Sequence, residues 1–317
     1  MIEPTELHEQ IAEYDAVLAR DGESDELEAR TRVATALVGK GRRLAKLGRA
    51  DEAFECLDRV VATFGDATEP ELRYQVARAL ANKGHALLEL GRYEETHAPF
   101  DELIAHYGED ADPRLRRRVA SAIYNKAYAL EQSRAFADAI TLVDELDARF
   151  SSDPALALRD LVADGFEVKA RALVAMGLTT EAIAVYDQLV ARYGADSSDE
   201  LRYAVAMALS SKADLIRERD RVQAIAVDDD LIARFRDAPE PDIRWLVINA
   251  LVLKGYSLEV LHREREAIPT YRQVLELAPT NNRPQAEKTI AWARTRYDEL
   301  TSKPGYRLRH EIRRRLG

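Results

Sequence analysis

Six lysines recur along the chain at steps of 43, 43, 43, 43 and 42 residues, and an aspartate lies 25 residues before each one. The lysines are Lys40, Lys83, Lys126, Lys169, Lys212 and Lys254. The aspartates are Asp15, Asp58, Asp101, Asp144, Asp187 and Asp229. Opposite charges at a fixed spacing can form ion pairs. Pairing inside one repeat would leave Asp15 alone, so we predict a ladder of Asp–Lys bridges between successive repeats, structural rather than catalytic.

Other residues that could do chemistry are weaker candidates. The run VGKGRRLA around Lys40 faintly resembles a phosphate-binding loop, but it is part of the repeat and no strand precedes it. The acidic run Asp228–Asp230 could suggest a metal site, yet three consecutive helical residues do not share a face. We interpret Cys56 as a small apolar residue. The motifs HExxH, GxxxxGK[ST], GxSxG and paired CxxC are absent from the sequence. We therefore expect a protein that is not an enzyme, without metal or cofactor.

The residues around each lysine have the spacing of an α-helix. In the second copy one apolar stripe consists of Val76, Leu80, Gly84 and Leu87. A second stripe follows after Gly91, which is typical of a helix end, and consists of Thr96, Phe100, Leu103 and Tyr107. Each repeat is therefore predicted to be an antiparallel pair, with helix A carrying the lysine and helix B the aspartate.

The predicted organisation is a single all-α solenoid over residues 1–302. It comprises a capping helix at 4–20, six helix pairs and a closing helix at about 284–301. The A helices are expected near 26–47, 69–90, 112–132, 155–176, 198–217 and 240–261. The B helices are expected near 50–64, 93–107, 135–150, 179–193, 221–235 and 264–277. Arg134 replaces the turn glycine in the third copy and the fifth turn is one residue short, so we expect distorted turns at both places.

The run ALANKGHALLELGRYEE, with Gly84, Gly91 and Tyr93, resembles a tetratricopeptide repeat. The usual period of that family is about 34 residues, and the longer period here resembles a long bacterial variant. The resemblance implies helix pairs stacked into a right-handed superhelix that acts as a binding scaffold. Some relatives hold C-terminal carboxylates with a lysine–asparagine clamp. Beside the repeat lysines this chain has pairs such as Tyr124 with Tyr128 instead, so binding of chaperone tails is not expected.

Charge and hydropathy narrow the function classes. The formal net charge is −10 and the pI is about 5.3, which argues against a general nucleic-acid binder because phosphate neutralisation needs a basic surface. No stretch approaches 18 consecutive apolar residues, and the acidic N-terminus has no apolar run. We therefore expect no membrane span and no signal peptide, and a cytoplasmic protein.

The face of helix A opposite the lysine is predicted to line a concave groove, and its residues vary from copy to copy. The candidate partner-binding residues are Tyr74, His85, Tyr124, Asn125, Tyr128, Arg171, Tyr203, Trp245 and Tyr256. Tyrosine and tryptophan interleaved with arginine are the usual composition of a binding hot spot. Neutral sequence change at solvent-exposed positions would also make these residues vary from copy to copy. The central cluster at 124–128 with Arg171 is the best candidate.

The sequence thus predicts a non-enzymatic scaffold that binds a peptide or a partner helix in this groove. The alternative is a self-associating structural or regulatory element, a possible homo-oligomer in which the basic tail 303–317 docks onto an acidic face of another copy. Cryptic enzymes and nucleic-acid binders are a third class, disfavoured by the charge and by the absent motifs. The identity of the protein partner stays open at this level.

Overall fold

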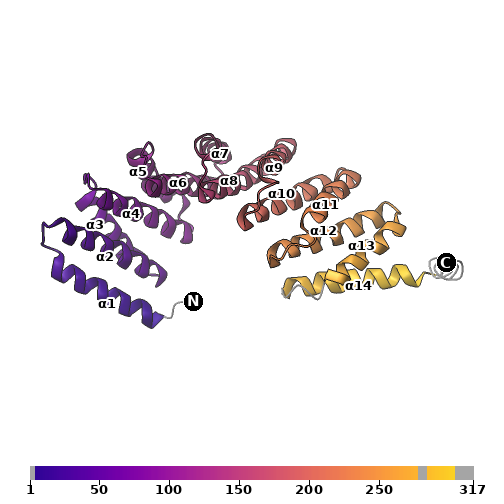
Figure 1. Cartoon of the computed structure of the whole chain (residues 1–317), viewed down its shortest axis with the longest axis horizontal. Helices are drawn as coiled ribbons and strands as arrows, with labels where there is room; N and C mark the ends of the chain where they lie inside the picture. Colours follow the sequence, from indigo (N-terminus) through magenta and orange to yellow (C-terminus); the bar gives the residue numbers. More distant parts are fainter. Residues whose placement is uncertain (1–3, 278–283, 304–317) are drawn as a thin grey trace. The chain divides into compact units, whose positions relative to one another are not determined.

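The computed structural model describes residues 4–277 and 284–303, and every regular element over these ranges is a helix (Figure 1). This confirms the predicted all-α class. Within each of the two units described below, the helices pack in the order of the sequence, each against the next. No helix in the described ranges is long and apolar enough to cross a bilayer.

The helices fall into two compact units, residues 1–177 and residues 178 onward. The first unit contains α1 (Pro4–Asp21), α2 (Leu27–Lys46), α3 (Ala50–Phe64), α4 (Pro70–Glu89), the 3-10 helix η1 (Tyr93–Thr96), α5 (His97–Tyr107), α6 (Pro113–Gln132), α7 (Phe136–Phe150) and α8 (Leu156–Ala175). The second contains α9 (Thr179–Tyr193), α10 (Asp199–Arg217), α11 (Arg221–Phe235), α12 (Pro241–Val260), α13 (Glu264–Leu277) and α14 (Pro284–Ser302). The single solenoid over 1–302 stays a prediction, and the tail beyond Lys303 lies outside the described residues.

Within each unit the A helices form a layer of their own. In the first unit α2 packs on α4, α4 on α6 and α6 on α8; in the second, α10 packs on α12. Three of these helices begin with proline at the first position, Pro70, Pro113 and Pro241, where the missing N–H costs nothing. The A helices thus present consecutive rigid surfaces on which side chains from different repeats lie side by side.

The turn between helix A and helix B has one left-handed residue, eight positions after the repeat lysine. Gly48, Gly91 and Gly177 occupy it with φ of 75°, 69° and 80°. Arg134 adopts the same conformation, with φ of 68°. Its turn also keeps the same hydrogen bonds, Ala135 N donating to the Leu130 oxygen as Arg92 N donates to the Leu87 oxygen. The expected distortion of the third turn is therefore wrong, because the backbone retains the turn and the arginine bears the steric cost.

The short fifth turn does differ from the others. Asp220 replaces the left-handed residue and has extended backbone, with φ of −145°. Its side chain accepts hydrogen bonds from Val222 N at 3.0 Å and Gln223 N at 2.9 Å, so it caps α11. The fifth turn is thus one residue shorter, yet backbone N–H groups in the first turn of α11 still have a hydrogen-bond acceptor.

The small residue after each lysine allows helix B to approach closely. A Cβ added to Gly84 would lie 2.3 Å from the Phe100 ring, and one added to Gly255 would lie 2.5 Å from the Tyr271 ring. Phe100 and Tyr271 are fully buried. In the second and sixth pairs the core therefore contains a large ring set into the space that the glycine leaves.

Candidate functional site

Each repeat lysine lies beside the aspartate 25 residues before it. Lys40 Nζ donates to Asp15 Oδ1 at 2.5 Å and Lys83 Nζ to Asp58 Oδ1 at 2.6 Å. The other contacts join Lys126 to Asp101, Lys169 to Asp144, Lys212 to Asp187 and Lys254 to Asp229. The aspartate side chains remain half exposed, between 51% and 57%. Water screens such pairs, so each contributes little to stability by itself.

On the A-helix layer of the first unit, an arginine cluster surrounds Tyr74 of α4. The guanidinium of Arg114 lies 4.7 Å from the centre of the Tyr74 ring, and those of Arg78 and Arg118 lie at 5.8 Å. Arg118 also donates to the Tyr74 hydroxyl at 3.4 Å. Ring faces attract cations, so the tyrosine holds guanidiniums from two helices, α4 and α6, in one place.

His85 and Asn125 connect this cluster to the middle of α6. His85 Nε2 lies 3.4 Å from Asn125 Nδ2, and its ring meets Phe100 edge to face. Asn125 is buried, and its amide donates to the Ser121 carbonyl at 2.7 Å. Desolvation and the charge of Arg118 lower the pKa of His85. These effects favour the neutral form of the exposed His85 ring, which Asn125 contacts from the neighbouring helix.

The predicted central cluster is partly core. Tyr124 and Tyr128 are half-buried and pack on Ala127, Val143 and Val168. Desolvation, with the nearby Asp164 carboxylate, raises the pKa of Tyr124 to about 12. The two tyrosines therefore contribute to the packing of α6 against α7 and α8 as well as to the surface.

Arg171 of α8 belongs to the same cluster but has a carboxylate partner. Its guanidinium donates to Glu131 at 3.3 Å and lies 6.0 Å from the centre of the Tyr128 ring. Asp164, about two turns earlier on α8, lies near Asp160 and Glu167, and desolvation with these like charges raises its pKa to about 6. The α6–α8 part of the layer is thus more acidic than the α2–α4–α6 part.

The second unit carries the remaining candidates. Tyr203 of α10 is 43% exposed, and Trp245 of α12 is half-buried. Tyr256 meets Trp292 of α14 edge to face, with 6.3 Å between ring centres, and Arg221 lies 5.6 Å from its centre. Trp292 also meets the buried Tyr271, as expected of a residue that covers the end of the core. Tyr256 is therefore in contact with α14, although it is as exposed as Tyr203, at 44% against 43%.

A pocket of about 410 Å³ opens on the α2–α4–α6 surface. Arg42, Lys46, Arg78, His85, Glu89 and Arg118 are among its lining residues. Arg78 and Arg118 are not among the binding residues predicted from the sequence. Arg78 lies five residues before Lys83, on the face predicted for the groove, so its position was the available signal. Arg118 lies outside those positions and was found only from the structure.

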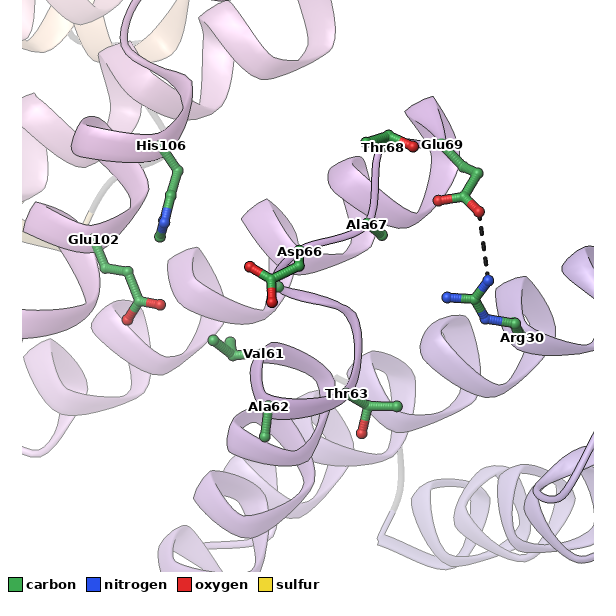
Figure 2. Close-up of a pocket in the computed structure, with 11 residues that line it drawn as sticks. Arg30, Val61, Ala62, Thr63, Asp66, Ala67, Thr68, Glu69, Glu102 and His106 are labelled. Atoms are coloured by element: carbon green, nitrogen blue, oxygen red, sulfur yellow. Dashed lines mark hydrogen bonds and ion pairs between the residues drawn. The ribbon is translucent and has the colours of Figure 1, made fainter. Parts of the chain in front are cut away.

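A second pocket, of about 510 Å³, lies at the loops between helices (Figure 2). Arg30 at its rim is paired with Glu69 at 3.4 Å, and Asp66, Glu102 and His106 line the rest. The Arg30 guanidinium of this pocket is thus already paired with a carboxylate from the start of the next repeat. Over the described ranges no group of three or more His, Cys, Asp or Glu side chains is arranged to hold a metal. Burial raises the pKa of the Cys56 thiol, which disfavours the reactive thiolate.

No known protein family matches the chain by sequence, and no curated protein matches it either. Among solved structures, the apo form of RapI is similar with a TM-score of 0.63 and 9% identity, over 90% of this chain and 79% of that one. An engineered protein gives a TM-score of 0.47 at 18% identity, over 78% and 97%. The TPR2AB domain of yeast Sti1, in its pHSP90 complex, gives 0.33 at 15%, over 85% and 98%. The chain has the fold of a tetratricopeptide-like repeat protein.

Proposed function

We propose that this protein is an interaction scaffold and that the A-helix layer of its first unit binds a peptide or a helix of a partner protein. The observation that carries the proposal is the row of half-exposed tyrosines on consecutive helices, each beside an arginine. Tyr74 lies with Arg118 on the α4–α6 surface, and Tyr128 lies with Arg171 on α6 and α8. Tyrosine and arginine supply much of the binding free energy at protein interfaces.

The layer is suited to an extended ligand because its side chains come from helices that are fixed by packing on both sides. A ligand therefore meets a surface that is already ordered, which lowers the entropic cost of binding. The repeats also offer contacts at regular intervals along the layer, which suits a peptide or a helix better than a compact small molecule.

Site-specific photocrosslinking in the native cell tests the proposal. A photoreactive phenylalanine would replace Tyr128 in one variant and His85 in another. The control would carry it in place of Thr141, an exposed residue of α7. We expect the first two variants to crosslink to the same protein and the control not to do so. Equal crosslinking from all three positions, or crosslinking only from position 141, would contradict binding at this layer.

A capture experiment gives an independent measurement. Wild type would be compared with Tyr128→Ala/Arg171→Glu in affinity capture from cell lysate, after both are shown to have equal helicity by circular dichroism. A partner that is held by the wild type and lost from the variant supports the proposed face. A partner held equally by both would place the binding surface elsewhere on the protein.

A further inference from the structure

The pocket on the α2–α4–α6 surface, here called the arginine pocket, brings together cations from three helices. Arg42 and Lys46 come from α2, Arg78 from α4 and Arg118 from α6. Glu89 is the one carboxylate among the pocket's lining residues. The pocket is therefore strongly positive on a protein whose net charge is −10.

Three of these cations have no carboxylate partner in the part of the chain that the structure describes. Within the described ranges, Arg42, Arg78 and Arg118 take part in no ion pair. Most of the neighbouring arginines do: Arg114 pairs with Glu71 at 2.8 Å and Arg116 with Asp153 at 2.7 Å. Desolvation and the charges of Arg118 and Arg42 lower the pKa of Arg78, which shows that the guanidiniums repel one another. Such an arrangement destabilises the free protein and favours binding of an anion.

Neutral groups hold the guanidiniums in place. Gln75 Oε1 accepts a hydrogen bond from Arg78 at 2.8 Å, and Tyr74 accepts one from Arg118 at 3.4 Å. Both arginines also lie over the Tyr74 ring. These contacts orient the donors while leaving the positive charge available. Guanidinium groups fixed in this way are suited to carboxylates, which they bind through two parallel hydrogen bonds.

We propose that the arginine pocket recognises the carboxylate side chains of an acidic polypeptide segment, glutamate or aspartate. The inference rests on the proposed function, because it assigns a chemical class to the partner that the A-helix layer binds. A volume of about 410 Å³ accommodates side chains of a peptide rather than a folded domain. The acidic surface around Asp164 and Glu167 on α8 would repel such a segment, which places its acidic part over α2 and α4.

Fluorescence anisotropy with a labelled glutamate-rich peptide tests the inference on the full chain. The control peptide has glutamine in place of every glutamate. We expect the wild type to bind the glutamate peptide, more weakly as salt is raised, and to bind the glutamine peptide at least roughly tenfold more weakly, since charged hydrogen bonds are lost. Equal binding of the two peptides would overturn the inference, because carboxylates would then not be what is recognised.

The site is tested with variants matched in charge. Arg118→Gln removes a pocket guanidinium, whereas Arg117→Gln removes the exposed neighbour on the same helix. We expect Arg118→Gln and Arg78→Gln each to weaken glutamate-peptide binding by roughly tenfold, and Arg117→Gln by less than about twofold. Equal losses from Arg117→Gln and Arg118→Gln would overturn the pocket as the site. Arg42→Gln, at an exposed position, gives the same test if Arg118→Gln lowers helicity.

Competition with two other anions tests whether the pocket prefers carboxylates to phosphate groups. Inorganic phosphate or a single-stranded RNA that displaced the peptide, and bound more tightly than it does, would overturn the assignment to an acidic polypeptide. Failure of the acidic-segment inference can also be distinguished from failure of the scaffold proposal. Crosslinking of a partner from position 128 without glutamate-peptide binding would overturn the acidic class alone. Absence of both would count against the scaffold proposal as well.

Discussion

Arg217 of α10 and Asp228 of α11 form a buried ion pair, with 2.9 Å between Arg217 Nη1 and Asp228 Oδ2. Asp228 directly precedes the ladder residue Asp229, as Phe100 precedes Asp101, so it takes the position that Phe100 and Tyr271 fill in the second and sixth repeats. The guanidinium also donates to the Ser257 hydroxyl at 3.3 Å. Desolvation raises the pKa of Asp228 to about 6 in spite of its partner. The fifth repeat thus has a buried charge pair where the second and sixth repeats have an aromatic ring.

Breaking this pair should destabilise the second unit more than replacing it. Asp228→Leu leaves the Arg217 charge buried without its main partner, and we expect a loss of about 3 kcal/mol in the free energy of unfolding. Arg217→Met/Asp228→Leu removes both charges and is expected to lie within about 1 kcal/mol of the wild type. Urea unfolding followed by circular dichroism measures both. A double variant as unstable as the single one would contradict this account.

Replacing Arg134 by glycine, the residue that other repeats have at this turn position, should raise the free energy of unfolding. A side chain costs about 1–2 kcal/mol in the left-handed region, and the extra freedom of glycine in the unfolded chain offsets part of that gain. We therefore expect Arg134→Gly to raise stability by up to about 1 kcal/mol. Gly91→Ala makes the converse change where no atom lies within 4 Å of the added Cβ, and it should be destabilising. Thermal unfolding compares the two, and a lower midpoint for Arg134→Gly would show that the turn is not strained.

The Asp–Lys ladder predicts coupling between repeats. In a double-mutant cycle with Asp101→Asn and Lys126→Met we expect a coupling energy of roughly 0.2–1 kcal/mol, because the aspartate is half exposed and the pair is screened. Raising the salt concentration should reduce it. The cycle is measured from urea midpoints of the four proteins. Strict additivity at low salt would mean that this contact does not fix the register of neighbouring helices.

Asp164 should make stability fall with rising pH. Its pKa is raised in the folded state to about 6, so the native protein binds the proton more tightly than the unfolded chain does. The wild type therefore loses stability as the pH rises from about 4 to about 6. Asp164→Asn lacks this loss and should be the more stable protein above pH 6, with the difference vanishing near pH 4. Thermal midpoints across this range measure the effect.

Glu13→Gln, at an exposed position of α1, is the control for that pH series. It removes one carboxylate from a different helix, outside the group of Asp160, Asp164 and Glu167. A difference that varied equally in both variants would reflect the total charge of the protein rather than the group of Asp160, Asp164 and Glu167.

The repeat in the sequence determined the helices and their order. Apolar stripes of period 3.6, a small residue where helix B approaches and a turn residue at a fixed offset are all local signals. The Asp–Lys spacing of 25 residues likewise pointed to contacts that the structure contains, since the geometry repeats with the sequence. The third turn shows the limit of this reasoning, because tertiary packing keeps Arg134 in a conformation that its own residue type disfavours.

The arginine pocket depended on the tertiary structure. Arg42, Arg78 and Arg118 lie at different offsets from the repeat lysines, so no column of the sequence contains them together. They meet because α2, α4 and α6 pack as a layer and because Tyr74 attracts two of them. Asp228 stands directly before the ladder residue Asp229, as Phe100 stands before Asp101, and only the structure shows that Arg217 pairs with it in the core. Periodicity in the sequence determined the repeat, and packing between repeats decided which charges are left unpaired.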